Sequence, residues 1–174
     1  HHDESVEIRA KNILEHVDLE IFDGGIYFLD QHGKIFRTRP ERPELIGQDW
    51  SDTRQFRYLQ EYQGQTGAFT DLQPLGKNGE EIVCSAISLN DVQGKFIGAG
   101  YYCFTIFPVT QNAYYTELNK VNLGQDVCIL DGNQRIIFSS DPSEIGKDLS
   151  KQAYVQNVLQ DPMMSIRYQK GPED

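Results

Sequence analysis

A pattern of strand, aspartate turn and strand occurs twice in this chain, and this repeat constrains the fold more than any other sequence feature. The first copy is IYFLDQHGKIF at 26–36, and the second is VCILDGNQRIIF at 127–138. Asp30 and Asp131, which open the two turns, are 101 positions apart. Alternating apolar residues on both sides of a short polar turn are typical of a β-hairpin. The chain is therefore predicted to hold two related structural units.

A loop motif follows each hairpin and strengthens this interpretation. It reads IGQDWS at 46–51 and IGKDLS at 145–150, with Gly47 and Gly146 separated by 99 positions. The difference of two positions between the two offsets is ordinary loop variation. The glycine allows a turn with positive φ, the apolar residues anchor the loop to the core, and the Asp or Ser can cap the helix that follows.

Hydrophobic periodicity and turn residues predict the other elements. Helices are expected over 4–22 and 53–63, with a short helix or connector over 112–121. Strands are expected over 68–73, 80–89 and 95–107, which form adjacent antiparallel hairpins. In place of these three strands, the second unit has a single expected strand, over 163–168. Ser51 or Asp52 is the expected N-cap of the second helix.

Composition excludes some classes of function. The chain has 174 residues, 39% of them hydrophobic, which suffices for one core or two small ones. Twenty-six acidic and sixteen basic side chains give a net charge of -10, which argues against nucleic-acid binding. No run of about 18 apolar residues occurs, so a membrane is expected only through helices absent from this chain. The start, HHDES, resembles the remnant of a histidine tag.

Residues suited to catalysis or metal binding are sparse. His16 and His32 are the histidines outside the tag-like start, and neither is near a cysteine in any expected register. The three cysteines, Cys84, Cys103 and Cys128, form no CxxC pair. We therefore expect no enzyme activity, no cofactor and no metal site in this domain.

The hairpin around 91–94 can be aligned from its turn. This register places Cys84 opposite Cys103 and Ala86 opposite Tyr101 on a face of mostly small residues. Such a face either leaves room for a ligand or packs closely against a helix. The register also raises a disulfide between the two cysteines, but three free thiols are expected because native cross-strand bridges demand strict geometry.

The repeated motifs resemble those of the double Cache family of extracytoplasmic sensor domains, over about residues 22–169. The resemblance is closest from CILD at 128–131, through SSDP at 139–142, to the second loop motif. It implies an α+β chain with an N-terminal helix and two PAS-like units with antiparallel sheets, the second truncated. The implied division is a tag remnant and helix at 1–21, a membrane-distal unit at 22–108 and an incomplete membrane-proximal unit at 109–174.

The resemblance also implies a ligand site in the distal unit. Amino-acid-binding Cache domains carry Arg, one residue and two aromatics, then an aromatic-x-Asp strand and a last Asp. Here Arg54 and Phe56 keep the Arg and one aromatic, with Arg57 beside them, and Phe69 and Asp71 keep the strand pair. The last Asp falls at Cys103, close to Tyr101, and is lost.

The implied site therefore comprises seven residues: Arg54, Phe56, Arg57, Phe69, Asp71, Tyr101 and Cys103. Because the last carboxylate is missing, an organic acid is favoured over a free amino acid as the ligand. The competing interpretation is that Arg54 and Arg57 only pair with surface acids such as Asp52 or Glu61.

The function implied is that of a ligand-sensing domain outside the cytoplasm, in a sensor histidine kinase or chemoreceptor that works as a homodimer. The alternative is a module of such a receptor that only dimerises or binds another protein.

Overall fold

A computed structural model describes residues 4–17, 21–62, 66–75, 79–106 and 128–160. The segments expected as a connector at 112–121 and a strand at 163–168 lie outside these ranges. The side chain of Phe69 is also outside the description, although its backbone belongs to a strand. No helix among the described residues is long and apolar enough to cross a membrane.

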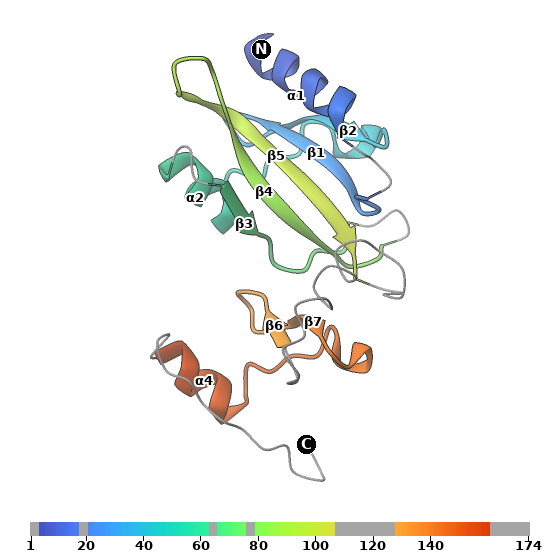
Figure 1. Ribbon diagram of the computed structural model, residues 1–174, viewed down its shortest axis with the longest axis vertical. Coiled ribbons are helices and arrows are strands. Elements are labelled where there is room, and N and C mark those ends of the chain that lie inside the picture. The colour runs from blue at the N-terminus through green and yellow to red at the C-terminus, as the bar shows by residue number, and fades with distance from the viewer. Residues whose placement is uncertain (1–3, 18–20, 63–65, 76–78, 107–127, 161–174) are drawn as a thin grey trace.

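The centre of the fold is a five-stranded antiparallel sheet, here called the large sheet (Figure 1). Its order is β2-β1-β5-β4-β3. The strands are β1 (Gly25–Asp30), β2 (Ile35–Arg39), β3 (Thr66–Phe69), β4 (Ile82–Asn90) and β5 (Phe96–Thr105). The predicted hairpins β1–β2, β3–β4 and β4–β5 are confirmed, although β3 ends at Phe69 and not at the predicted residue 73. The central strands β1 and β5 are far apart in sequence, and their pairing joins the hairpins into one sheet.

The predicted register of the β4–β5 hairpin is confirmed residue by residue. Cys84 lies opposite Cys103, and Ala86 lies opposite Tyr101. Because side chains alternate across a strand, this register puts these four residues on one face of the sheet. All four are buried in one apolar cluster on that face.

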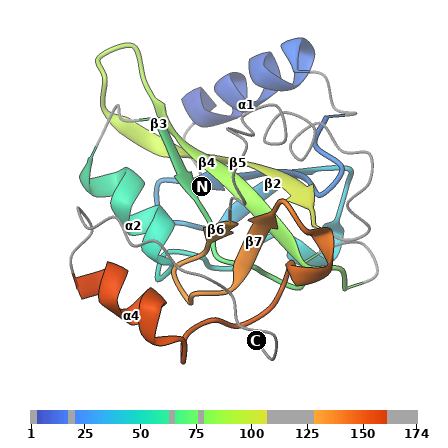
Figure 2. The same ribbon diagram turned by 60° about the horizontal axis from the view of Figure 1, so that its bottom comes forward.

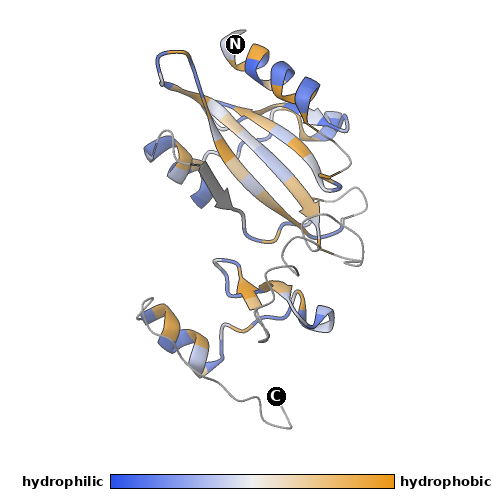
Figure 3. Cartoon of the chain, in the orientation of Figure 1, coloured by the Kyte–Doolittle hydropathy of each residue, from blue (hydrophilic) through white to orange (hydrophobic). Residues whose placement is uncertain are grey.

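The opposite face of the large sheet is covered by helix α1 (Glu4–His16). Val6 and Ala10 are fully buried there among Ile26, Phe28 and Tyr102. Figure 3 shows hydrophobic and hydrophilic residues alternating along this helix, as an amphipathic helix requires. The helix is shorter than the predicted 4–22, since the chain has already turned at Phe22, whose carbonyl accepts from the Gly25 N–H at 2.8 Å.

The described residues after 127 form a two-stranded sheet, here called the small sheet, made of β6 (Cys128–Leu130) and β7 (Ile136–Ser139). It lies beyond the end of the large sheet where β4 starts and β5 stops (Figure 1). An apolar cluster joins the two parts, with Ile136 and Ile137 packed against Val83 and Phe104. Helix α4 (Ala153–Gln160) follows, in line with the prediction of a helix after each loop motif (Figure 2).

The repeat is reproduced in the hydrogen bonds of its two copies. In the first, Ile35 N–H donates to Gln48 O (3.0 Å) and Gly47 N–H to Ile35 O (2.7 Å). In the second, Ile136 donates to Lys147 O (2.9 Å) and Gly146 to Ile136 O (2.8 Å). Gly47 and Gly146 both have φ of 84°, as expected for the turn. The two copies of the hairpin and loop motif therefore share individual backbone contacts, while the predicted division into two units stays a prediction.

Candidate ligand-binding site

Helix α2 (Arg54–Glu61) carries three of the seven predicted site residues and covers the cysteine-bearing face of the large sheet. Its N-cap is Thr53, whose hydroxyl accepts from the Phe56 N–H at 3.4 Å. The prediction of Ser51 or Asp52 as the cap was wrong. The Ser51 N–H donates to Asp49 at 2.9 Å within the loop motif, and Asp52 pairs with Arg57.

Two predicted residues, Phe56 and Tyr101, lie at the centre of an aromatic core between α2 and the sheet. Each is 1% exposed. Phe56 meets Phe96 edge to face at 5.7 Å between ring centroids, and Tyr101 meets Trp50 in the same way at 5.4 Å. Such edge-to-face pairs add to the stabilisation from burial. This side of the sheet is therefore filled by rings rather than left open.

The hydroxyl of Tyr101 is an exception within this core. It is buried and has no hydrogen-bond partner among the described residues. The nearby Thr53 hydroxyl instead donates to the Trp50 carbonyl at 2.8 Å. Burial raises the pKa of Tyr101 to about 12. The Thr53 hydroxyl is close enough to lower this pKa slightly, but its geometry does not meet that of a hydrogen bond with Tyr101. A buried polar group without a partner costs about 1–3 kcal/mol, so this hydroxyl marks a place where a polar ligand atom would be stabilising.

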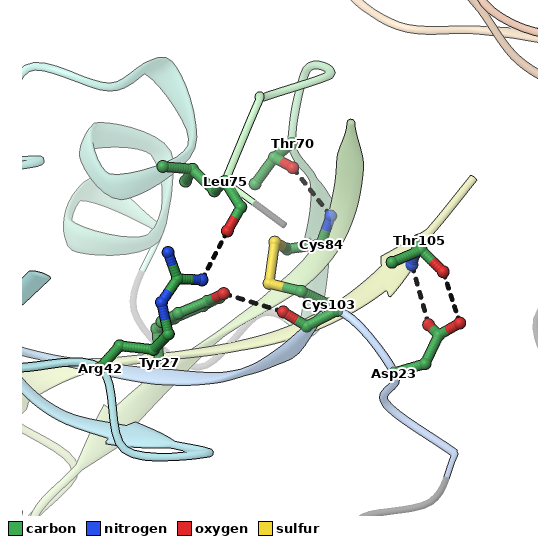
Figure 4. The surroundings of a disulfide bond; sticks show 9 residues. Asp23, Tyr27, Arg42, Thr70, Leu75, Cys84, Cys103 and Thr105 are labelled. Atoms are coloured by element: carbon green, nitrogen blue, oxygen red, sulfur yellow. Dashed lines mark hydrogen bonds between the residues drawn. A yellow bond between two sulfur atoms is a disulfide. The ribbon is translucent and has the colours of Figure 1, made fainter. Parts of the chain in front are cut away.

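Cys84 and Cys103 form a disulfide below α2 (Figure 4). The expectation of three free thiols was wrong. The Cys84 N–H donates to the Thr70 hydroxyl, and the Cys84 carbonyl accepts from the Thr70 N–H, both at 2.8 Å. Its backbone groups thus point away from β5, which makes Cys84–Cys103 a non-hydrogen-bonded pair. Side chains approach most closely at such pairs. The predicted site residue Cys103 is therefore half of a cystine.

Arg54 and Asp71 are brought together at the outer side of α2. The Arg54 Nη2 donates to Asp71 Oδ1 at 3.0 Å, with 64% of the arginine side chain and 24% of the aspartate side chain exposed. The same oxygen accepts the backbone N–H of Gly132 at 2.8 Å, although these residues are 61 positions apart. The resulting arrangement links α2, the segment after β3 and the turn of the small sheet.

Arg57 points elsewhere and pairs with Asp52 at 2.5 Å. Both side chains are largely exposed, at 64% and 95%, and surface pairs of this kind contribute little stability. For Arg57, the structure shows the surface pairing that was considered as the competing interpretation. Arg54 is different because its partner Asp71 is itself a predicted site residue.

Three contributors to this region were not predicted as site residues: Tyr27, Trp50 and Thr53. Tyr27 and Trp50 pack at 6.0 Å between ring centroids within the aromatic core. A signal for Trp50 was present, because it occupies the apolar anchor position of the first loop motif. Thr53 could have been recognised as a capping residue two positions beyond Ser51.

Two hollows in the described parts of the chain lie away from these residues. One, of about 600 Å³, lies between α1 and the outer half of β4, next to Tyr102. The other, of about 370 Å³, lies beside β2 and Arg42. Both are open grooves on other sides of the sheet. Within the described ranges, no cluster of three or more His, Cys, Asp or Glu residues could hold a metal ion.

Comparison with known proteins gives a fold but no sequence family. No family model and no curated protein matches the chain. Among solved structures, an extracellular ligand-binding receptor from Desulfohalobium retbaense matches 97% of this chain at 19% identity and a TM-score of 0.53. The extracellular domain of a candidate histidine kinase matches 78% at 20% identity and 0.53. The chain shares the fold of these two proteins.

The same sensor fold is shared with the ligand-binding domain of the Pseudomonas aeruginosa amino-acid chemoreceptor PctB in complex with L-Arg. That domain matches 86% of this chain at 17% identity and a TM-score of 0.55. This chain spans 32%, 54% and 56% of the lengths of these three structures. The fold is therefore matched over most of this chain but over only part of each larger sensor.

Proposed function

We propose that this chain is the ligand-sensing domain of a transmembrane signalling receptor of the histidine-kinase or chemoreceptor type. The observation that carries the proposal is the pairing of Arg54 with Asp71 beside α2. This helix covers the buried Tyr101 hydroxyl, which has no hydrogen-bond partner in the part of the chain that the structure describes. Charged groups at the rim of an apolar core, with a polar atom inside it, are the usual composition of a small-molecule site. The sensor fold supports the same function.

The proposed location is outside the cytoplasm. The Cys84–Cys103 disulfide supports it, because disulfides persist in oxidising compartments and are rare in the cytosol. The structures with the same fold are described as extracellular domains, which agrees with this assignment. In this proposal, membrane-spanning helices outside the present sequence connect the domain to an output domain.

The proposed ligand is a small organic acid. The guanidinium of Arg54 presents a planar fork that suits a carboxylate. A free amino acid would also need acceptors for its ammonium group, and Asp71 is the one carboxylate among the seven site residues. Chemoreceptor domains of this fold were solved in complex with L-valine, L-Arg and GABA, so amino acids remain the class to test against.

Isothermal titration of acetate, pyruvate, L-valine, L-arginine and GABA tests this proposal. We expect an acid to bind the wild type and to lose about tenfold or more in affinity in Arg54→Gln, because a charge-assisted hydrogen bond contributes about 1.5–3 kcal/mol. Tyr101→Phe should weaken binding without destabilising the free protein. Arg37→Gln, which removes an exposed arginine paired with Glu7 at 4.0 Å, is the matched control. Binding of amino acids alone would overturn the choice of an organic acid.

A second candidate function is a module that dimerises or binds another protein without sensing. The filled aromatic core around Tyr27, Trp50 and Phe56 favours it, since a permanently closed core has no space for a ligand. Failure of every probe to bind the wild type, together with a dimer that no probe affects, would support this alternative. Analytical ultracentrifugation with and without the probes provides that measurement.

A further inference from the structure

The turn of the small sheet is docked on the large-sheet part by a reciprocal pair of hydrogen bonds. The Gly132 N–H donates to Asp71 Oδ1 at 2.8 Å, and the Leu72 N–H donates to Asp131 Oδ2 at 3.1 Å. Each side thus supplies one carboxylate and one backbone N–H. We call this arrangement the joint. Because both acceptors are carboxylates, these bonds are stronger than ordinary backbone hydrogen bonds.

Two further contacts support the joint. Arg135 donates to both carboxylate oxygens of Glu81, at 2.6 and 2.7 Å, in a bidentate pair that is about 30% exposed on each side. Beside it lies the apolar cluster that joins Ile136 and Ile137 to Val83 and Phe104. The joint is therefore a built interface with polar and apolar parts.

Gly132 makes room for the Arg54 guanidinium, and its backbone conformation does not require glycine. It is not among the glycines with positive φ, whereas Gln134 adopts a φ of 62°. In the first hairpin the glycine is Gly33, at the position equivalent to Gln134, with φ of 80°, and Gln31 follows the aspartate. The second turn therefore has glycine at the position where a Cβ would overlap the Arg54 guanidinium.

Arg54 and Asp71 thus both contact the turn of the small sheet. Asp71 Oδ1 is shared between the Arg54 guanidinium and the Gly132 N–H, and the guanidinium itself lies against Gly132. The Arg54 side chain is 64% exposed, so the turn contests only the side of the guanidinium that faces Gly132 and Asp71. A carboxylate that engaged that side would need the space held by the turn. A group that bound Asp71 Oδ1 would compete with the Gly132 N–H directly.

We propose that the Asp131–Gly132 turn is an internal competitor for the ligand, so that ligand binding releases the joint and docking of the joint weakens ligand binding. This inference rests on the proposed ligand site at Arg54 and Asp71. In this proposal the joint is the contact that transmits the signal, because a bound ligand breaks the hydrogen bonds between the small sheet and the large-sheet part. Thermodynamic linkage requires that each event weakens the other by the same factor.

The test uses a variant that loosens the joint and leaves Arg54 and Asp71 intact. Glu81→Gln combined with Arg135→Gln removes the bidentate pair at constant net charge. The matched control combines Glu144→Gln with Lys147→Gln, which removes an ion pair of 3.7 Å inside the second unit. Hydrogen exchange of the Leu72 and Gly132 amides reports on docking, and titration of acetate, pyruvate, L-valine, L-arginine and GABA reports on binding.

We expect the joint variant to lose amide protection at Leu72 and Gly132 and to bind at least one probe about fivefold or more tighter than the wild type and the control. In the wild type, a bound probe should speed exchange at Gly132. Unchanged protection in the variant would overturn the joint. Lost protection with unchanged affinity would overturn the competition and leave the proposed function standing. No binding to either protein would overturn both.

Discussion

The two aspartate turns have the same local structure and different surroundings. Asp30 Oδ1 accepts the N–H groups of His32 (2.9 Å) and Lys34 (3.0 Å). Asp131 Oδ1 accepts those of Asn133 (2.9 Å) and Arg135 (2.8 Å), and its second oxygen also takes the Leu72 N–H. The same aspartate turn therefore stabilises only its own hairpin bonds in the first copy, whereas in the second copy it also joins two parts of the molecule.

The largest effect on stability is expected when the two aspartates are replaced one at a time. Asp131→Ala should lower the free energy of unfolding by about 4 kcal/mol and Asp30→Ala by about 2 kcal/mol, because the former also leaves the Leu72 N–H without its acceptor. Both carboxylates are buried, at 9% and 8% exposure, so the difference should not come from burial. Urea unfolding of the two variants measures it, and equal losses would contradict a special role for Asp131.

The next effect concerns the cross-link that only the large sheet has. Replacing Cys84 and Cys103 together by Ala should destabilise the protein by about 3 kcal/mol, since the bridge closes a loop with a sequence separation of 19. Cys128→Ser, at the free cysteine of the small sheet, is the control and should change stability by less than about 0.5 kcal/mol. Thermal unfolding with and without a reducing agent gives an independent measurement on the wild type. A wild type insensitive to reduction would count against the bridge as a stabilising element.

A smaller effect is expected at the residue after each aspartate. Gly132→Ala should cost up to about 1 kcal/mol, because the new methyl group displaces the exposed Arg54 guanidinium from Asp71. Gln31→Ala, at the equivalent position of the first turn, should stay within about 0.5 kcal/mol. Chemical denaturation of both variants provides the comparison. A neutral Gly132→Ala would show that Arg54 moves aside without loss.

The smallest effect is expected on the pKa values of the aspartates in the two loop motifs, and it tests whether the motifs are equivalent. The hydroxyl and N–H of Ser51 lower the pKa of Asp49, and those of Ser150 lower the pKa of Asp148. Because folding lowers both pKa values, these carboxylates stabilise the folded chain above their unfolded pKa, and this contribution is lost as the pH falls through the folded pKa.

Ser51→Ala should therefore raise the pKa of Asp49 and leave that of Asp148 unchanged, and Ser150→Ala should do the reverse. Carboxyl titration by NMR measures both groups in one experiment. A shift of both carboxyl groups in either variant would mean that the two motifs are coupled.

The hairpins, and the register of the β4–β5 hairpin, could be predicted because they depend on neighbours in sequence. The turn at 91–94 alone placed Cys84 opposite Cys103, and alternation assigned the faces of β4 and β5 correctly. The candidate site was predicted less completely. Arg54 and Asp71 do meet, but Arg57 pairs with the adjacent Asp52, and the cap of α2 is Thr53.

What the sequence determined by itself is the repeat: two hairpins, two loop motifs with glycine at positive φ, and the pairing of neighbouring strands. Turn chemistry and the two-residue period of a strand act over a few residues, so they can be read directly. Only the tertiary structure decided that Asp71 meets Gly132 across 61 positions and that Glu81 meets Arg135 across 54. Such contacts depend on how packed elements approach one another, and no local pattern encodes that approach.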